Sequence, residues 1–122
     1  MNNDYKLFSA EEKDEEGKPL IRYDISLANN ENIAYAVVRP VSSEGDGPWI
    51  SGLCVRSDHR GKGLASELMR RIESDFEGQV LRGRARPYKD EPMETKELLE
   101  MYKAWGFEPY DPDEPTRLKK QV

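Results

Sequence analysis

The feature that most constrains the fold is a short apolar run followed by a glycine-containing turn and a long stretch with helical spacing. The apolar run is Trp49–Val55, and the turn contains Gly61 and Gly63. After the turn, apolar residues recur three or four positions apart, as on one face of an amphipathic helix: Ala65, Leu68, Met69, Ile72 and Phe76. The spacing predicts a strand over 49–55, a loop, and a helix over 62–76 that stops at Gly78.

The loop before this helix is a candidate anion site. A helix N-terminus has backbone N–H groups without intrahelical acceptors and carries the positive end of the helix dipole. Glycines allow a ligand close to the backbone, and Arg60 and Lys62 add positive charge. The spacing of a nucleotide-triphosphate loop is absent, and the dinucleotide pattern Gly-x-Gly-x-x-Gly fails at Ser66. Two interpretations remain from these residues: a phosphate or pyrophosphate site, or a turn in which the glycines have no ligand.

The sequence before residue 49 predicts an antiparallel meander. Residues 20–28 alternate between apolar and polar types, with Ile21, Tyr23, Ile25 and Leu27 on one face. Further strands are predicted over 5–10 and 33–39, separated by an exposed charged turn over 11–19 and turn-forming residues at 29–32. Residues 40–48 are rich in proline, glycine and serine and predict a loop.

The sequence after residue 78 predicts a fifth strand over 79–87 and a second helix over 93–105. Gly106 stands where a left-handed helix C-cap belongs, and Phe107 could then fold back on the helix. The tail, 108–122, leaves room for a short final strand.

Two segments resemble the GNAT superfamily, the acyl-CoA-dependent N-acetyltransferases. Arg60-x-x-Gly63-x-Ala65 resembles the family signature Arg/Gln-x-x-Gly-x-Gly/Ala, and Tyr102 with Gly106-Phe107 is similar to the family's helix that ends in a tyrosine before Gly-Phe. The segments occur in the family's order and span roughly residues 49–110. The resemblance implies an α/β (α+β) fold in which a mixed, mostly antiparallel central sheet of about five to seven strands is flanked by two main helices. We expect residues 1–122 to form one such domain.

The resemblance also implies a function, the transfer of an acetyl group from acetyl-CoA to an amine of a small molecule or protein by direct attack. Tyr102 matches the family's general acid, which protonates the departing thiolate; simple packing on an apolar helix face is the alternative. In the family, the loop amides hold the CoA pyrophosphate and the preceding strand contacts the pantetheine and the acetyl group. The residues that the resemblance assigns to the cosubstrate are Leu53, Cys54, Val55, Arg60, Gly61, Lys62, Gly63, Leu64, Ala65 and Ser66.

Departures from the family pattern leave a second function open. The family usually has two helices between its first two strands, and residues 11–19 are too few for them, so the acceptor pocket should be open or completed by 40–48 or another subunit. The asparagine that often ends the fifth strand is replaced by Ala85-Arg86-Pro87, and the fourth strand has no carboxylate to act as a base. The alternative function is a catalytically silent GNAT-fold module that binds a protein partner.

Several other polar residues have open roles. Arg82, Arg84 and Arg86 share one face of the predicted fifth strand, which could be a solvated or salt-bridged face, bind an anionic acceptor or an acidic segment of the tail, or contact nucleic acid. The net charge of −5 argues against nucleic acid. His59 precedes the loop instead of facing the acetyl group, and Cys54 lacks a histidine partner in view, so neither is assigned a catalytic role.

Length and composition bound the remaining possibilities. The 122 residues can bury a single core, and the lone cysteine excludes an internal disulfide and a cysteine-rich metal site, so no metal is expected. The first residues lack a secretory signal pattern, and no apolar run is long enough to cross a membrane. We therefore expect a cytoplasmic protein. The sequence leaves the identity of the amine acceptor and the oligomeric state open.

Overall fold

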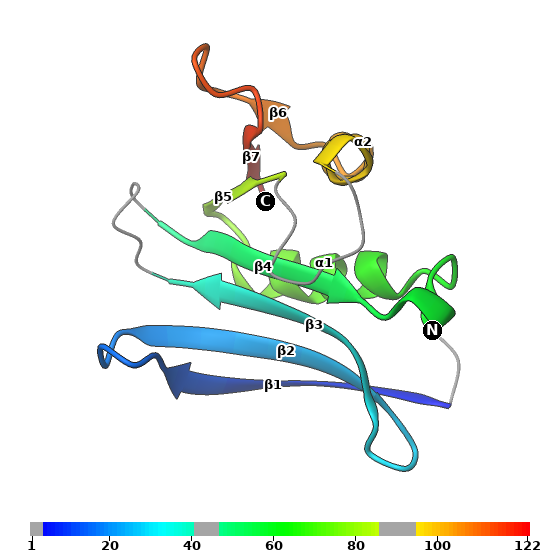
Figure 1. Ribbon diagram of the computed structural model, residues 1–122. Coiled ribbons are helices and arrows are strands. Elements are labelled where there is room, and N and C mark those ends of the chain that lie inside the picture. Colours follow the sequence, from blue (N-terminus) through cyan, green and yellow to red (C-terminus); the bar gives the residue numbers. More distant parts are fainter. Residues whose placement is uncertain (1–3, 41–46, 86–94) are drawn as a thin grey trace.

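The strands predicted from alternating apolar residues form a single seven-stranded sheet in the computed structural model, which describes residues 4–40, 47–85 and 95–122 (Figure 1). The strand order is β1-β2-β3-β4-β5-β7-β6, and every neighbouring pair is antiparallel except β4 and β5. The strands are β1 (Tyr5–Lys13), β2 (Pro19–Leu27), β3 (Asn32–Arg39), β4 (Trp49–Val55), β5 (Val80–Arg84), β6 (Glu108–Pro109) and β7 (Arg117–Gln121). This mixed sheet with two helices confirms the predicted fold class.

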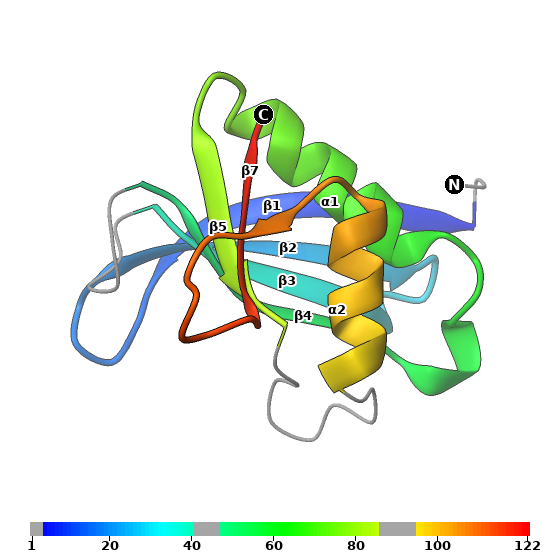
Figure 2. The same ribbon diagram turned by 90° about the horizontal axis from the view of Figure 1, so that it is seen from above.

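Helix α1 (Leu64–Asp75) provides the crossover that a parallel pair of strands requires between β4 and β5. Figure 2 shows it along one side of the sheet, where it contacts β2, β3 and β4. Its predicted apolar face is buried there, through Leu64, Leu68, Met69 and Ile72. At its last turn, the hydroxyl of Tyr23 on β2 donates a hydrogen bond to the Asp75 carboxylate at 2.9 Å. The helix is therefore fixed to the sheet at both its apolar face and its C-terminal end.

Helix α2 (Thr95–Ala104) ends as the sequence predicts, at a left-handed glycine. Gly106 has φ +96°, and its N–H donates to the carbonyl of Lys103, while the N–H of Phe107 donates to the carbonyl of Tyr102. This is the Schellman arrangement, which turns the chain sharply and satisfies the last helical carbonyls. The ring of Phe107 then lies edge-on to the ring of Tyr102, with centroids 5.2 Å apart.

Most differences from the predicted elements lie at their ends. Residues 11–13, expected in an exposed turn, instead extend β1, because their pairing with 19–21 of β2 continues without interruption. Helix α1 begins at Leu64 instead of residue 62, and a short 3-10 turn, Ser57–His59, precedes the glycine loop. The two-residue strand β6 was not predicted, whereas the final strand β7 confirms the one allowed for the tail. Much of the predicted loop over 40–48, the end of the predicted fifth strand and the start of the second helix lie outside the described residues.

Burial raises the pKa of the Tyr23 hydroxyl above its ordinary value near 10, and the hydrogen bond to Asp75 raises it further. A raised pKa means that the folded state holds this proton after the unfolded chain has lost it, so stability falls as the pH rises above about 10. We expect the free energy of unfolding, measured by urea titration between pH 8 and pH 11, to fall less steeply with pH in Tyr23→Phe than in the unmodified protein. At pH 8 the same variant should be about 1 kcal/mol less stable, the usual contribution of a hydrogen bond. Identical pH slopes would contradict the assignment.

Candidate functional site

The site is formed where β4 and β5 separate. The two strands pair in parallel only at Trp49–Arg82 and Ile50–Gly83, after which β5 runs away from β4 (Figure 2). The register between β3 and β4 shifts at the same level, because Val37 lies opposite Gly52 while Val38 lies opposite Ile50. Ser51 is thus the extra residue of a β-bulge, and its Oγ hydrogen-bonds the carbonyl of Val37 at 3.3 Å. The bulge increases local twist and helps to part the two strands.

The loop that follows β4 has the backbone geometry of an anion cradle. Gly61 and Gly63 have φ of +76° and +78°, in the left-handed region that favours glycine, and Gly63 is the N-cap of α1. A Cβ built on either glycine would meet no atom within 4 Å. The first intrahelical bond runs from Glu67 to the carbonyl of Gly63, so the amides of residues 64–66 have no intrahelical acceptor. These amides lie at the positive end of the helix dipole, beside open space.

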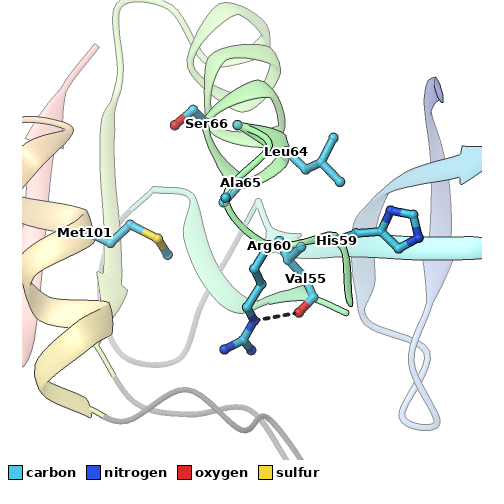
Figure 3. Close-up of a pocket in the computed structure, with 9 residues that line it drawn as sticks. Val55, His59, Arg60, Leu64, Ala65, Ser66 and Met101 are labelled. Carbon is cyan, nitrogen blue, oxygen red and sulfur yellow. Dashed lines mark hydrogen bonds between the residues drawn. The ribbon is translucent and has the colours of Figure 1, made fainter. Parts of the chain in front are cut away.

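A pocket of about 230 Å³ lies between this loop and α2 (Figure 3). Its lining comes from the end of β4, the loop, the first turn of α1 and one residue of α2: Val55, His59, Arg60, Gly61, Gly63, Leu64, Ala65, Ser66 and Met101. Arg60 donates from Nε to the carbonyl of Val55 at 3.1 Å, which ties the loop to the end of β4. The His59 ring points away from Met101 and contacts the edge of the Tyr5 ring, with centroids 6.1 Å apart. Its imidazole therefore supports the loop from the β1 side.

A second, much smaller cavity lies at the point where the strands part. It has a volume of about 10 Å³, enough for roughly one water molecule. Residues of β4, β5 and α2 line it: Ile50, Ser51, Gly52, Leu53, Arg84, Leu98 and Tyr102. A Cβ built on Gly83 would lie 3.4 Å from both Cβ and the carbonyl oxygen of Ile50 and 4.0 Å from the hydroxyl of Tyr102, all ordinary contact distances, so this hydroxyl lies beside β5 and the start of β4. The hydroxyl of Tyr102 is thus held against the parting strands.

Tyr102 is 3% exposed, and its environment determines its ionisation. Burial alone raises the pKa of its hydroxyl above the ordinary value near 10. Its ring is held between two others, those of Phe107 and Trp105, both edge-on, with centroids at 5.2 and 5.5 Å. The phenol is therefore protonated and held in one orientation at neutral pH, and it can donate a proton or a hydrogen bond.

One hydrogen bond joins the two helices that flank the pocket. The indole N–H of Trp105, next to the end of α2, donates to the Oγ of Ser66 in the first turn of α1 at 3.1 Å. Trp105 and Ser66 are 39 positions apart in the chain, and no sequence pattern predicted this contact or the place of Met101 in the pocket wall. Because Oγ accepts this bond, the hydroxyl hydrogen of Ser66 is directed elsewhere and remains available to an acceptor.

The structure brings most of the expected cosubstrate residues to these two cavities. Val55, Arg60, Gly61 and the stretch 63–66 line the larger one, and Leu53 lines the smaller one. Lys62 is exposed and Cys54 is half-buried, and neither contributes to the lining of either cavity. Within 4–40, 47–85 and 95–122, no three metal-ligating side chains are grouped so as to hold a metal ion.

The arginine face of β5 lies beside cationic residues of β7. Arg82 is opposite Lys119, and both cations lie 5.9 Å from the centre of the Tyr110 ring; Arg84 is opposite Arg117. An acid of the tail pairs with this face, since Asp111 lies 3.4 Å from Arg117. Arg86 lies outside the described residues. Arg82 and Arg84 of β5 therefore lie next to residues of β7 and of the tail that precedes it.

The sequence from residue 2 to residue 107 matches the family described as Acetyltransferase (GNAT) family. This match covers most of the chain, and the protein belongs to that family. No curated protein matches the sequence. No helix within the described part is both long enough and apolar enough to pass through a bilayer.

Solved structures with the same fold share little sequence with this chain. An acetyltransferase from Thermus thermophilus is 22% identical with a TM-score of 0.61; the match covers 82% of this chain but only 61% of that one. The GNAT family N-acetyltransferase YhbS of Escherichia coli, solved in complex with CoA, is 14% identical with a TM-score of 0.65. That match covers 98% of this chain and 83% of YhbS. Arabidopsis thaliana Naa50, solved with the bisubstrate analogue CoA-Ac-MVNAL, is 18% identical with a TM-score of 0.58. That match covers 83% of this chain and 72% of Naa50. At these identities the likeness establishes the fold.

The hydrogen bond between Trp105 and Ser66 should couple the two helices energetically. We expect Trp105→Phe, which keeps an aromatic ring but removes the donor, and Ser66→Ala each to lower the free energy of unfolding by roughly 1–2 kcal/mol. In the double variant the losses should not add, and the coupling energy in a double-mutant cycle should be about 0.5–1.5 kcal/mol. Urea unfolding of the four proteins measures this, and strictly additive losses would show that the bond contributes nothing.

Proposed function

We propose that the protein is an acyl-CoA-dependent N-acetyltransferase that uses acetyl-CoA as cosubstrate and an amine of a small molecule or protein as acceptor. The observation that supports this best is the placement of two left-handed glycines and the N-terminus of α1 beside the point where β4 and β5 part. That arrangement suits a pyrophosphate at the loop and an extended arm running along β4. Family membership and the CoA-containing complexes of YhbS and Naa50 are in agreement with it.

The loop is proposed to hold the diphosphate through backbone donors. The amides of Gly63, Leu64 and Ala65 lie at the helix N-terminus, and the hydroxyl hydrogen of Ser66 is directed toward an acceptor by the bond from Trp105. Arg60 acts here by fixing the loop to Val55, and the exposed Lys62 adds positive charge to the loop. Backbone groups of Leu53, Cys54 and Val55 are proposed to contact the pantetheine arm, which the separation of β5 from β4 makes room for.

The smaller cavity must open before a thioester can reach Tyr102. With a volume of about 10 Å³ it cannot hold an acetyl group and a sulfur atom. Its walls are the paired strand β4 on one side, and Arg84 of β5 with Leu98 and Tyr102 of α2 on the other. Entry of the arm is proposed to displace the Arg84 side chain and to move α2 outward from β4, against the resistance of the Trp105–Ser66 bond.

The proposed reaction is a direct transfer. The neutral amine nitrogen forms a bond to the carbonyl carbon of the thioester, and the negative charge that develops on the carbonyl oxygen is stabilised by backbone N–H groups near the Ser51 bulge. The carbon–sulfur bond then breaks, and the sulfur takes a proton from Tyr102. The amine nitrogen loses a proton to water, which returns one to the phenol. A phenol with an ordinary pKa near 10 is protonated at neutral pH, and burial of Tyr102 keeps it protonated before the thioester enters.

Loss of the glycine geometry should abolish cosubstrate binding. We expect acetyl-CoA at saturating concentration to raise the melting temperature of the protein and to leave that of Gly63→Asp unchanged, because the carboxylate would repel the diphosphate and fill the space beside the amides. Thermal shift measured by differential scanning fluorimetry tests this.

Gly17 provides the matched control for that experiment. It has φ +79° and open space around its Cβ position, as Gly63 does, but it lies in the β1–β2 hairpin. Gly17→Asp should carry a similar backbone cost and keep the full rise in melting temperature. Equal responses of the two variants would contradict a diphosphate site at Gly63.

Removal of the phenol should slow the chemical step without weakening binding. We expect Tyr102→Phe to lower kcat by at least about tenfold, since general acid catalysis contributes a factor of roughly 10²–10⁴, while the Kd for acetyl-CoA changes by less than about threefold. Release of CoA thiol with a panel of amine acceptors measures kcat, and calorimetry measures Kd. Acetyl-CoA binding without turnover of any amine would favour the catalytically silent module over the enzyme.

A further inference from the structure

The outer edge of β1 is a long and regular strand edge. Within the described residues β1 pairs on one side only, with β2, through nine consecutive residue pairs without a register shift. The pairs β2–β3 and β3–β4 each contain a shift, and β1 does not. The segment has no proline. Such an edge presents backbone N–H and C=O groups that favour pairing with a further strand.

We propose that this edge binds the same edge of a second copy of the chain, with the two β1 strands antiparallel about a two-fold axis centred on Ser9. In an antiparallel pair, two residues directly opposite each other are either both hydrogen-bonded to each other or both not. When the two strands are identical and related by a two-fold axis, the axis therefore passes beside a residue that lies opposite its own copy. Ser9 is the middle residue of Tyr5–Lys13. Centring there pairs every residue of the strand with a residue of the other copy.

The charges of the strand fit this register. With Ser9 opposite Ser9, Lys6 lies opposite Glu12 of the second copy and Glu12 lies opposite Lys6, so the interface contains two cross-strand pairs of opposite charge. The neighbouring registers, centred on Phe8 or Ala10, each pair only seven residues of the strand, and neither places two residues of the strand with opposite charges opposite each other. Charges that protect an edge strand repel a second copy, whereas Lys6 and Glu12 attract one in the register centred on Ser9.

The apolar surface of the strand fits the same register. Phe8 is 49% exposed and is the large hydrophobic residue that stands out to solvent in the described part of the chain. With Ser9 at the centre, Phe8 lies opposite the small side chain of Ala10 and diagonal to Phe8 of the second copy, within reach of an aromatic contact. Pairing therefore buries this exposed aromatic side chain at the middle of the interface.

Charge reversal tests the register. The unmodified chain should show a concentration-dependent rise from 14.1 kDa to twice that mass in sedimentation equilibrium. We expect Lys6→Glu and Glu12→Lys each to weaken the dimer about tenfold, because each replaces two attractions by two repulsions. The double variant Lys6→Glu/Glu12→Lys should regain the dimer, since it restores both opposite-charge pairs with the charges exchanged.

A cross-link tests the centre of the interface, with Cys54 retained throughout. Residues directly opposite in an antiparallel pair have Cα atoms about 4.5–5.5 Å apart, within the range that a disulfide spans. Ser9→Cys should therefore form an intermolecular disulfide under mild oxidation. Glu11→Cys, exposed on the same face of the strand, should not, because this register separates the two copies of residue 11 by about 14 Å. A chain that stays monomeric at all concentrations, a dimer unaffected by either single reversal, or equal cross-linking of the two cysteine variants would overturn the proposal.

Discussion

The arrangement of the whole site depends on how briefly β4 and β5 pair. A parallel pair of strands that continued along its length would fill the space between them with backbone hydrogen bonds and leave no place for a ligand. Here the pairing stops after Ile50 and Gly83, at the level where the extra residue Ser51 bends β4. The backbone of β4 beyond this point keeps β3 as a neighbour and is therefore rigid, while its other side faces the end of α2 and the glycine loop.

A few specific contacts position α2 against the separated strands and against α1. The Tyr102 hydroxyl lies beside Gly83 of β5, and the Schellman turn at Gly106 brings Phe107 back to support the Tyr102 ring. Trp105 then connects the same end of α2 to the first turn of α1. The C-terminal end of α2 thus carries the proposed proton donor, and next to it lies the link to the proposed diphosphate site. A ligand that moves α2 at one of these points would therefore also shift the other.

The sequence predicted the local elements of this arrangement but not how they meet. Strand β4 and the apolar face of α1 follow from periodicity, and the C-cap at Gly106 follows from glycine's tolerance of positive φ, because each depends on residues close together in the chain. The bulge at Ser51, the Trp105–Ser66 bond and the small size of the cavity at Tyr102 depend on packing between distant segments, and no local pattern encodes them. The extension of β1 through residues 11–13 was missed because its charged residues are typical of a turn, whereas on an edge strand they face solvent.

The direct β1–β2 hairpin has consequences at two separate places in the sheet. Without helices between these strands, the side of β1–β4 opposite α1 carries no helix in the described part of the chain, and the outer edge of β1 is open (Figure 1). The first leaves that side of β4 without a covering helix, and the second leaves a strand edge for pairing. Three strand spacings, about 14 Å, separate β1 from β4. A second copy paired along β1 would extend the sheet away from β4, and it would be linked to the glycine loop through Tyr5, whose ring contacts the ring of His59.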